Sequence, residues 1–193
     1  MLTILSNPTI AIIALAWIAF LLYWVISAIG AKSKRRTKKW VWAMLMIVAV
    51  FGLLLLLRLA GIPKNINVIL WPRNLPADIC SDVVVVAGLF VVIWARRTLG
   101  ANWSANVQIE ADHELVQSGP YKYVRHPIYS GFLTMVLGTA IAYGQLLGVV
   151  ILAVSFAGFF LKAMREESIL TERFSEAYLR YKVRTKTLIP YIL

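Results

Sequence analysis

Long apolar runs, almost free of charge, are the feature that most constrains what this chain can fold into. Three runs cover residues 9–30, 40–57 and 79–95, and two more cover residues 128–143 and 146–163. A helix of about 20 apolar residues spans the hydrocarbon core of a bilayer, where every backbone polar group has to be paired within the protein. The runs therefore predict an all-α integral membrane protein with about five transmembrane helices.

The composition agrees with this class and excludes several others. Hydrophobic residues make up 60% of the chain and charged residues 15%, whereas an average soluble domain is about 25% charged. Cys80 is the sole cysteine, so a disulfide within the chain is excluded. His113 and His126, the two histidines, are too far apart without cysteine support to predict a metal site. The glycine-rich motifs that bind dinucleotides and nucleoside triphosphates are absent from the sequence.

The charge pattern predicts how the chain is oriented. The net charge is +11, but the basic residues flank the apolar runs, which favours contact with anionic membrane lipids over nucleic acid. With five spans, 17 of the 20 Lys and Arg residues fall on one side of the membrane and three on the other. The positive-inside rule then places the N-terminus outside, and the C-terminus and the long polar loop in the cytoplasm.

The last two spans are predicted to form a hairpin, because only Gly144 and Gln145 separate them. From residue 164 to about residue 183 we expect a charged amphipathic helix with one apolar stripe, suited to lying on a membrane surface. In the third span, Asp78 and Asp82 are expected in the first turn, where a carboxylate can cap a helix or favour its dipole. Residues 1–97 would then hold three N-terminal spans, and residues 98–193 the catalytic region.

The polar loop before the fourth span has the composition of a binding site. It contains both histidines and a Gly119–Pro120 turn, and it ends with Arg125, His126 and Tyr129 where it meets the span. Pro127 suits the first position of that helix, and the free N–H groups of a helix start can receive an anion. The alternative is an interfacial belt, because Tyr, Arg and His are common where spans meet headgroups.

Glu166 and Glu167, at the end of the fifth span, form a second candidate cluster. Adjacent carboxylates at a membrane boundary are costly unless they are solvated or paired. In a hairpin they come close to Arg125 and His126, so that groups of both signs face one pocket, as a zwitterionic ligand requires. The alternative is a solvated helix end with Arg165 as a neighbour.

Several short motifs follow one another in order between residues 99 and 190, about half the chain. They are Leu99–Ser104, His113–Val116, Gly119–Tyr121, Val124–Gly131, Glu166–Leu170, Phe174, Tyr178, Tyr181, Arg184–Thr185 and Leu188–Pro190. In this order and spacing they resemble the isoprenylcysteine carboxyl methyltransferase family, and at lower resolution the related phospholipid N-methyltransferases.

The resemblance implies S-adenosylmethionine as cofactor, bound without a Rossmann fold. The residues it implies for cofactor binding are Gln108, His113, Glu114, Leu115, Val116, Tyr121, His126, Pro127, Ile128, Tyr129 and Glu166. Arg125, His126 and Glu167 are the catalytic candidates, the last two as bases if the acceptor is an amine. In some members of the family an arginine meets the substrate carboxylate, and its position corresponds to about Lys162 of this chain. A lysine there keeps the positive charge but lacks the two parallel donors of a guanidinium. Lys186 replaces the usual glycine after Arg184–Thr185, a second departure.

These observations predict a membrane-embedded methyltransferase that uses S-adenosylmethionine at the cytoplasmic face. Its acceptor would be a lipid-like or prenylated amphiphile that enters from the bilayer, and catalysis would depend mainly on positioning and charge matching. The alternatives are a phospholipid N-methyltransferase, an NADPH-binding enzyme of the sterol-reductase type, and a non-enzymatic membrane scaffold or transporter subunit. The scarcity of charge within the spans counts against a transporter.

Overall fold

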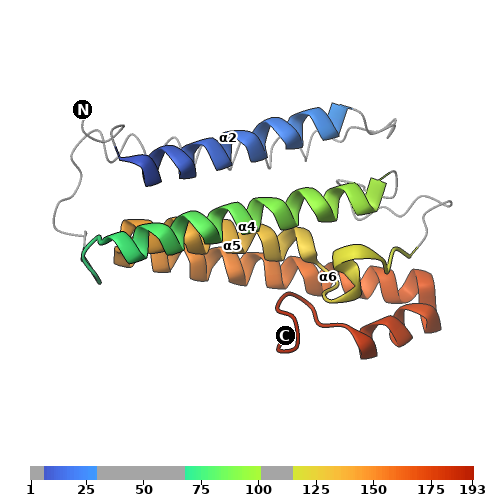
Figure 1. Ribbon diagram of the computed structural model, residues 1–193. Helices are drawn as coiled ribbons and strands as arrows, with labels where there is room; N and C mark the ends of the chain where they lie inside the picture. The colour runs from blue at the N-terminus through green and yellow to red at the C-terminus, as the bar shows by residue number, and fades with distance from the viewer. Residues whose placement is uncertain (1–6, 30–67, 101–114) are drawn as a thin grey trace.

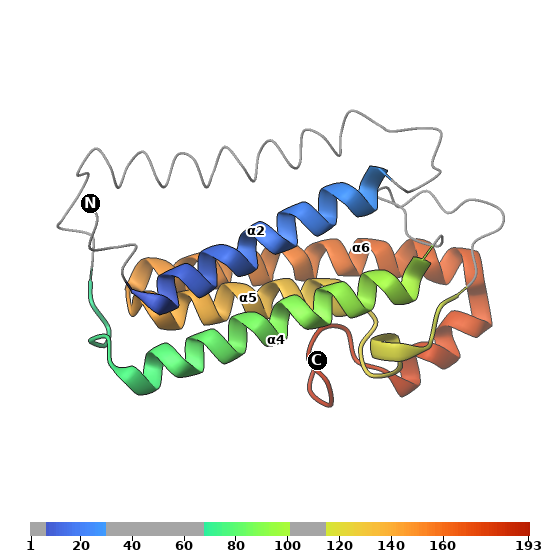
Figure 2. The same cartoon turned by 45° about the horizontal axis from the view of Figure 1, so that its top comes forward.

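The computed structural model describes residues 7–29, 68–100 and 115–193. Over these ranges the regular structure is helical, and α5 lies between α4 and α6 while α2 packs mainly against α4 (Figures 1 and 2). The predicted span at residues 40–57 lies outside the described residues. The helices are α2 (Pro8–Ile29), α4 (Leu75–Leu99), the short 3-10 helix η3 (Gly119–Lys122), α5 (Pro127–Tyr143) and α6 (Leu146–Arg184).

Three of the described helices are long and apolar enough to cross a membrane, namely Pro8–Ser27 within α2, α4, and α6. The fourth, α5, has 17 residues, which gives it a length of about 25 Å at the usual helical rise. The described part of the chain is thus an all-helical membrane architecture, as the apolar runs predict.

Glycines set the close approach of α4 and α5. A Cβ atom added to Gly88 would lie 2.7 Å from both the carbonyl oxygen of Gly131 and the backbone nitrogen of Met135. The same holds on the other helix, where a Cβ on Gly138 would lie 2.8 Å from the backbone nitrogen of Val85. Small residues of this kind let backbones pack closely where lipid leaves little hydrophobic drive for helix association.

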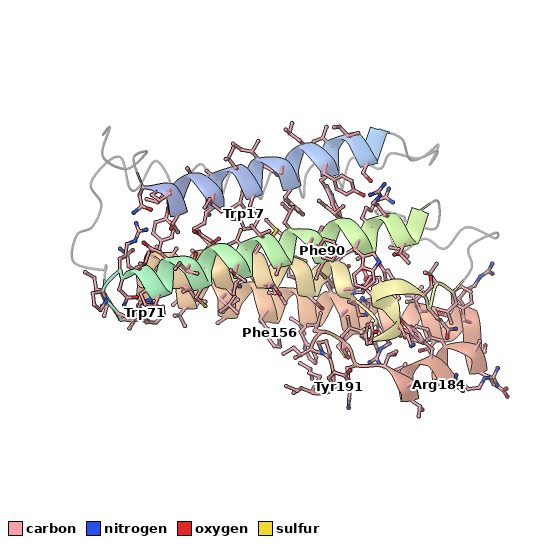
Figure 3. The ribbon with its side chains drawn as sticks, in the orientation of Figure 1. Trp17, Trp71, Phe90, Phe156, Arg184 and Tyr191 are labelled. Atoms are coloured by element: carbon pink, nitrogen blue, oxygen red, sulfur yellow. The ribbon has the colours of Figure 1, made fainter. Side chains whose placement is uncertain are left out.

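Helix α2 is attached through aromatic side chains. Trp17 and Phe20 of α2 meet Phe132 of α5, with ring centroids 5.3 Å and 5.7 Å from it. Trp17 points from α2 toward the other helices (Figure 3), and its Nε1 donates to Oγ1 of Thr139 at 3.1 Å. Edge-to-face rings and an interhelical hydrogen bond thus hold α2 against the α4–α5 pair.

The start of α4 differs in detail from the prediction. Asn74 is the N-cap residue, and its side chain accepts a hydrogen bond from the backbone nitrogen of Ala77 at 2.9 Å. Asp78 lies in the first turn but pairs with Arg73 at 3.0 Å, and Asp82, one turn further on, accepts from Thr9 at 3.3 Å. Of the two predicted roles, the cap belongs to Asn74, while Asp78 lies in the first turn, where its carboxylate favours the helix dipole. Asp82 lies beyond the first turn, because the helix begins at Leu75, earlier than the apolar run does.

The joint between α5 and α6 confirms the predicted hairpin. Gly144 closes α5 with a left-handed φ of 61°, and α6 begins at Leu146. The boundary of the following helix was placed wrongly, because α6 does not stop near residue 164. Its helix-favouring Arg, Glu and Leu residues carry it on to Ser175, whose φ of 45° and ψ of −121° break it, and the chain then turns back (Figure 1).

Candidate functional site

The start of α5 and the charged part of α6 bring both candidate clusters together. Arg125 Nε lies 2.7 Å from Oε1 of Glu167, and His126 Nδ1 lies 3.5 Å from Oε2 of Glu166. The prediction that the hairpin would bring these two pairs of residues close together is confirmed.

Local backbone geometry explains why these side chains meet. Gly119 adopts the left-handed φ of 58° that opens η3, and His126 is the N-cap residue of α5 with Pro127 at the first helical position. On α6, Glu166 and Glu167 are consecutive, so their side chains leave the helix about 100° apart. The two carboxylates therefore reach different partners.

Arg125 is the central donor of the cluster. Besides Glu167, its guanidinium donates to the carbonyl oxygens of Lys182 and Thr185 and, at 2.8 Å, to Oγ1 of Thr187. Its backbone nitrogen donates to the carbonyl of Lys186 at 2.8 Å. One side chain thus clamps the start of α5 to α6 and to the segment that follows it.

Glu167 is the buried carboxylate of the pair. Its side chain is 3% exposed, and while Oε1 accepts from Arg125, Oε2 lies 2.9 Å from Nζ of Lys182. Both oxygens are therefore paired with cations, which compensates the cost of burying the charge.

Glu166 is the accessible carboxylate, with its side chain 21% exposed. It accepts a hydrogen bond from the Tyr129 hydroxyl at 2.6 Å and lies 4.0 Å from Nζ of Lys162. The Tyr129 ring stacks between His126, at a centroid distance of 5.4 Å, and Phe159, at 4.8 Å. A half-buried carboxylate, an aromatic wall and a cation thus share one corner.

The two carboxylates set the protonation of His126. Burial by itself lowers the pKa of the imidazole, but Glu166 and Glu167 on its two sides outweigh burial, so the pKa is raised. Nε2 lies 3.5 Å from Glu167 Oε1 but has no hydrogen-bond partner among the described residues. The ring is therefore held between two anions, with an ion pair but, within the described part of the chain, no hydrogen bond at Nε2.

The remaining predicted residues are partly covered by the structure. Tyr121 is buried in η3, where burial raises the pKa of its phenol, and its carbonyl oxygen accepts from the Tyr181 hydroxyl at 2.6 Å. Leu115 and Val116 are half-buried just before η3, and Ile128 is half-buried in the first turn of α5. Gln108, His113 and Glu114 lie outside the described residues.

Sequence reasoning missed Lys182 and Thr187. Both belong to the segment that folds back after Ser175 and reach Glu167 and Arg125 from there. The sequence contains only an indirect signal. The neighbouring residues Tyr181, Thr185 and Leu188 belong to the family motifs, which indicate that this segment matters but not which residues it contacts.

Fold and site together define a class, that of integral membrane proteins built of packed helices. A mixed-charge cluster lies where α5 begins and the apolar part of α6 ends, and its residues are Arg125, His126, Glu166, Glu167 and Lys182. The model of the Isoprenylcysteine carboxyl methyltransferase (ICMT) family matches residues 81–172, a stretch that includes both carboxylates and the start of α5. Residues 81–172 thus match the model of this family, and the resemblance seen in the sequence is confirmed.

Relatives of known name support the assignment. The protein-S-isoprenylcysteine O-methyltransferase of Saccharomyces cerevisiae is 35% identical over 125 residues, which are 62% of this chain and 52% of the relative. The enzyme of that name from Homo sapiens is 36% identical over 117 residues, 55% and 41% of the two chains. The chain spans about half the length of the curated relatives it matches.

A solved structure shares the fold. It is that of a eukaryotic intramembrane Ras methyltransferase, ICMT, and the similarity has a TM-score of 0.62 at 23% sequence identity. It covers 96% of this chain and 66% of the other. The helical arrangement of Figure 1 is therefore shared with that structure.

Proposed function

We propose that this protein is a membrane-embedded methyltransferase of the isoprenylcysteine carboxyl methyltransferase type, with S-adenosylmethionine as its cofactor. The observation that carries the proposal is the Glu166 corner, where an accessible carboxylate, two stacked rings and Lys162 lie together. The family model that matches residues 81–172 and the relatives that match 62% and 55% of the chain bear the name of this activity. The acceptor would be a lipid-like or prenylated molecule entering from the bilayer.

The residues present fit the amino-acid end of the cofactor. Glu166 offers a carboxylate to an ammonium group, and Lys162, half exposed beside it, offers a cation to a carboxylate. The Tyr129 ring, stacked between His126 and Phe159, holds its hydroxyl on Glu166 and so keeps that carboxylate in place. For the nucleoside end the resemblance indicates Tyr121 and the segment from His113 to Val116.

When bound, the cofactor supplies an activated methyl group to a nucleophilic atom of the acceptor. The protein's own residues have to bind, orient and exclude water. Arg125 and Glu167 hold each other and the folded-back segment, so we assign them to positioning, as residues that keep His126 and Glu166 in place. A carboxylate acceptor is already nucleophilic and needs no base; for an amine acceptor His126 would first have to give up the proton that Glu166 and Glu167 favour on its ring.

We also propose that the site faces the cytoplasm, with the N-terminus outside and residues 98–193 as the catalytic region. The support is the distribution of charge, with 17 of the 20 basic residues on one side of a five-span topology. A reporter fused after Leu193 should read cytoplasmic. An external reading would reverse the topology and place the site on the other side of the membrane.

Calorimetry on the purified protein tests the function. S-adenosylmethionine should bind, and Glu166→Gln should weaken binding about tenfold or more, because a hydrogen bond to a charged group contributes about 1.5–3 kcal/mol. His126→Ala should also weaken it.

Glu176→Gln is the matched control, since this glutamate is highly exposed and pairs only with Arg180 among the described residues. It should leave the affinity unchanged. Absence of binding at millimolar cofactor would end the proposal, and equal affinities of Glu166→Gln and the parent protein would move the site elsewhere.

A further inference from the structure

We propose that the terminal loop, residues 188–193, inserts its apolar side chains into the lipid leaflet at which α5 begins. The loop would anchor the edge of the mixed-charge cluster in the bilayer interface. This inference does not depend on the proposed methyltransferase function.

The terminal loop is closed by its own backbone. The backbone nitrogens of Leu188 and Ile189 donate to the carbonyl of Leu193 at 2.8 Å and 2.7 Å, and the Leu193 nitrogen donates back to Ile189 at 3.0 Å. Leu188 is buried, whereas Tyr191 is 86% exposed and Ile192 75% exposed. A loop pinned at its base thus presents large apolar side chains at its tip, which in a soluble setting would be an unexplained apolar patch.

The register of the preceding segment fixes the depth of the loop. Val124 and Lys186 form a parallel bridge, and two residues after Val124 the backbone nitrogen of His126 donates to the carbonyl of Thr187 at 3.1 Å. Further along, the Ser130 hydroxyl donates to the carbonyl of Leu188 at 2.5 Å. The two segments therefore advance together, so the residues after Leu188 lie level with the first turns of α5.

The figures agree with this placement. The chain folds back after Ser175, and its end lies beside the helix bundle rather than beyond it (Figures 1 and 2). Along the direction of the spans, Tyr191 lies between Phe156 of α6 and Arg184 (Figure 3). Arg184 thus lies farther from the middle of the spans than Tyr191 does.

Charge supports lipid as the occupant of this face. Exposed Arg180, Arg184 and Lys186 precede the loop, and Tyr191 at its tip lies nearer the middle of the spans than Arg184 (Figure 3). Basic residues outside and aromatic and aliphatic residues inside form the pattern of interfacial membrane anchors, in which cations meet anionic headgroups. A protein partner in solution would have to reach a tip that lies level with the start of a span.

Depth-dependent quenching tests the insertion. The background is Cys80→Ser, which removes the sole cysteine. Tyr191→Cys and Ile192→Cys are made separately in this background, and each new cysteine is labelled with a small fluorophore. The full chain is then reconstituted in vesicles of lipids with brominated acyl chains. Val154→Cys, on an exposed apolar position of α6, is the lipid-facing reference. Glu176→Cys is the water-facing reference, because this glutamate is highly exposed and charged.

We expect both loop positions to be quenched by brominated chains nearly as strongly as Val154→Cys, and Glu176→Cys to be quenched hardly at all. Iodide in the aqueous phase should give the reverse order. Quenching at Tyr191→Cys and Ile192→Cys that matches Glu176→Cys would overturn the inference. Two loop positions are used so that one label that disturbs the loop does not decide the result, and neither reading requires cofactor or activity.

Discussion

Helix α5 is held at two places by opposite means. Along its length it meets α4 through Gly131 and Gly138, whose backbones touch α4 with no room for a side chain. At its start it is held by Arg125 and Glu167, a buried ion pair. The glycine contact between α4 and α5 depends on side-chain volume, whereas the Arg125–Glu167 contact depends on charge compensation. The span interior should therefore tolerate apolar changes that keep size, and the cluster should tolerate few changes at all.

The largest expected effect comes from breaking the buried pair. Among the described residues, Arg125→Ala leaves Glu167 with Lys182 and His126 as cations, and removing one partner of a buried pair costs about 3–5 kcal/mol. Arg73→Ala is the matched control, because the Arg73–Asp78 pair has side chains 36% and 19% exposed, against 8% and 3% for Arg125–Glu167. An exposed pair of this kind is worth about 0–1 kcal/mol. Thermal unfolding in one detergent measures both variants.

Arg125→Lys sharpens the same comparison. It keeps the charge near Glu167 but loses the fork that also reaches Thr187 and two carbonyls, so its loss should fall between those of the two alanine variants. If Arg125→Ala and Arg73→Ala lower stability equally, the cluster is solvated and the contrast between the two regions fails.

The second prediction concerns volume along α5. A Cβ on Gly88 would lie 2.7 Å from backbone atoms of Gly131 and Met135, which cannot move cheaply, so Gly88→Ala should cost about 1–3 kcal/mol as overpacking does. In Gly158→Ala the new Cβ meets nothing within 4 Å, and the change should be neutral or stabilising by up to about 1 kcal/mol. Equal midpoints for the two variants in a thermal melt would show that α4 and α5 separate easily.

The same contrast explains which features of the fold and the site could be predicted from the sequence. Apolar runs predict the described long helices directly, and Gly144–Gln145 predicts the hairpin, because both are local features. The meeting of Arg125 with Glu167 follows from the hairpin alone. Lys182 and Thr187 could not be assigned, because their partners depend on the reversal at Ser175, a left-handed residue inside an otherwise helix-favouring stretch. Our proposal for Arg125 moves from catalysis to positioning for the same reason, because two of its guanidinium nitrogens donate to the segment that follows Ser175.

The smallest effect is a pH dependence that separates the two regions. The pKa of His126 is raised in the folded protein above its ordinary value of about 6.5, so the protonated ring stabilises the fold. That contribution is fully present below about pH 6.5 and is lost as the pH rises through the folded-state pKa.

The unfolding midpoint of the parent protein should therefore exceed that of His126→Gln most at low pH, and the gap should narrow as the pH rises. Gly88→Ala changes no titrating group, so its gap to the parent should stay constant over the same range. A constant gap for His126→Gln as well would mean that the imidazole is not charged between Glu166 and Glu167, and that the ion cluster is held by Arg125 and the lysines alone.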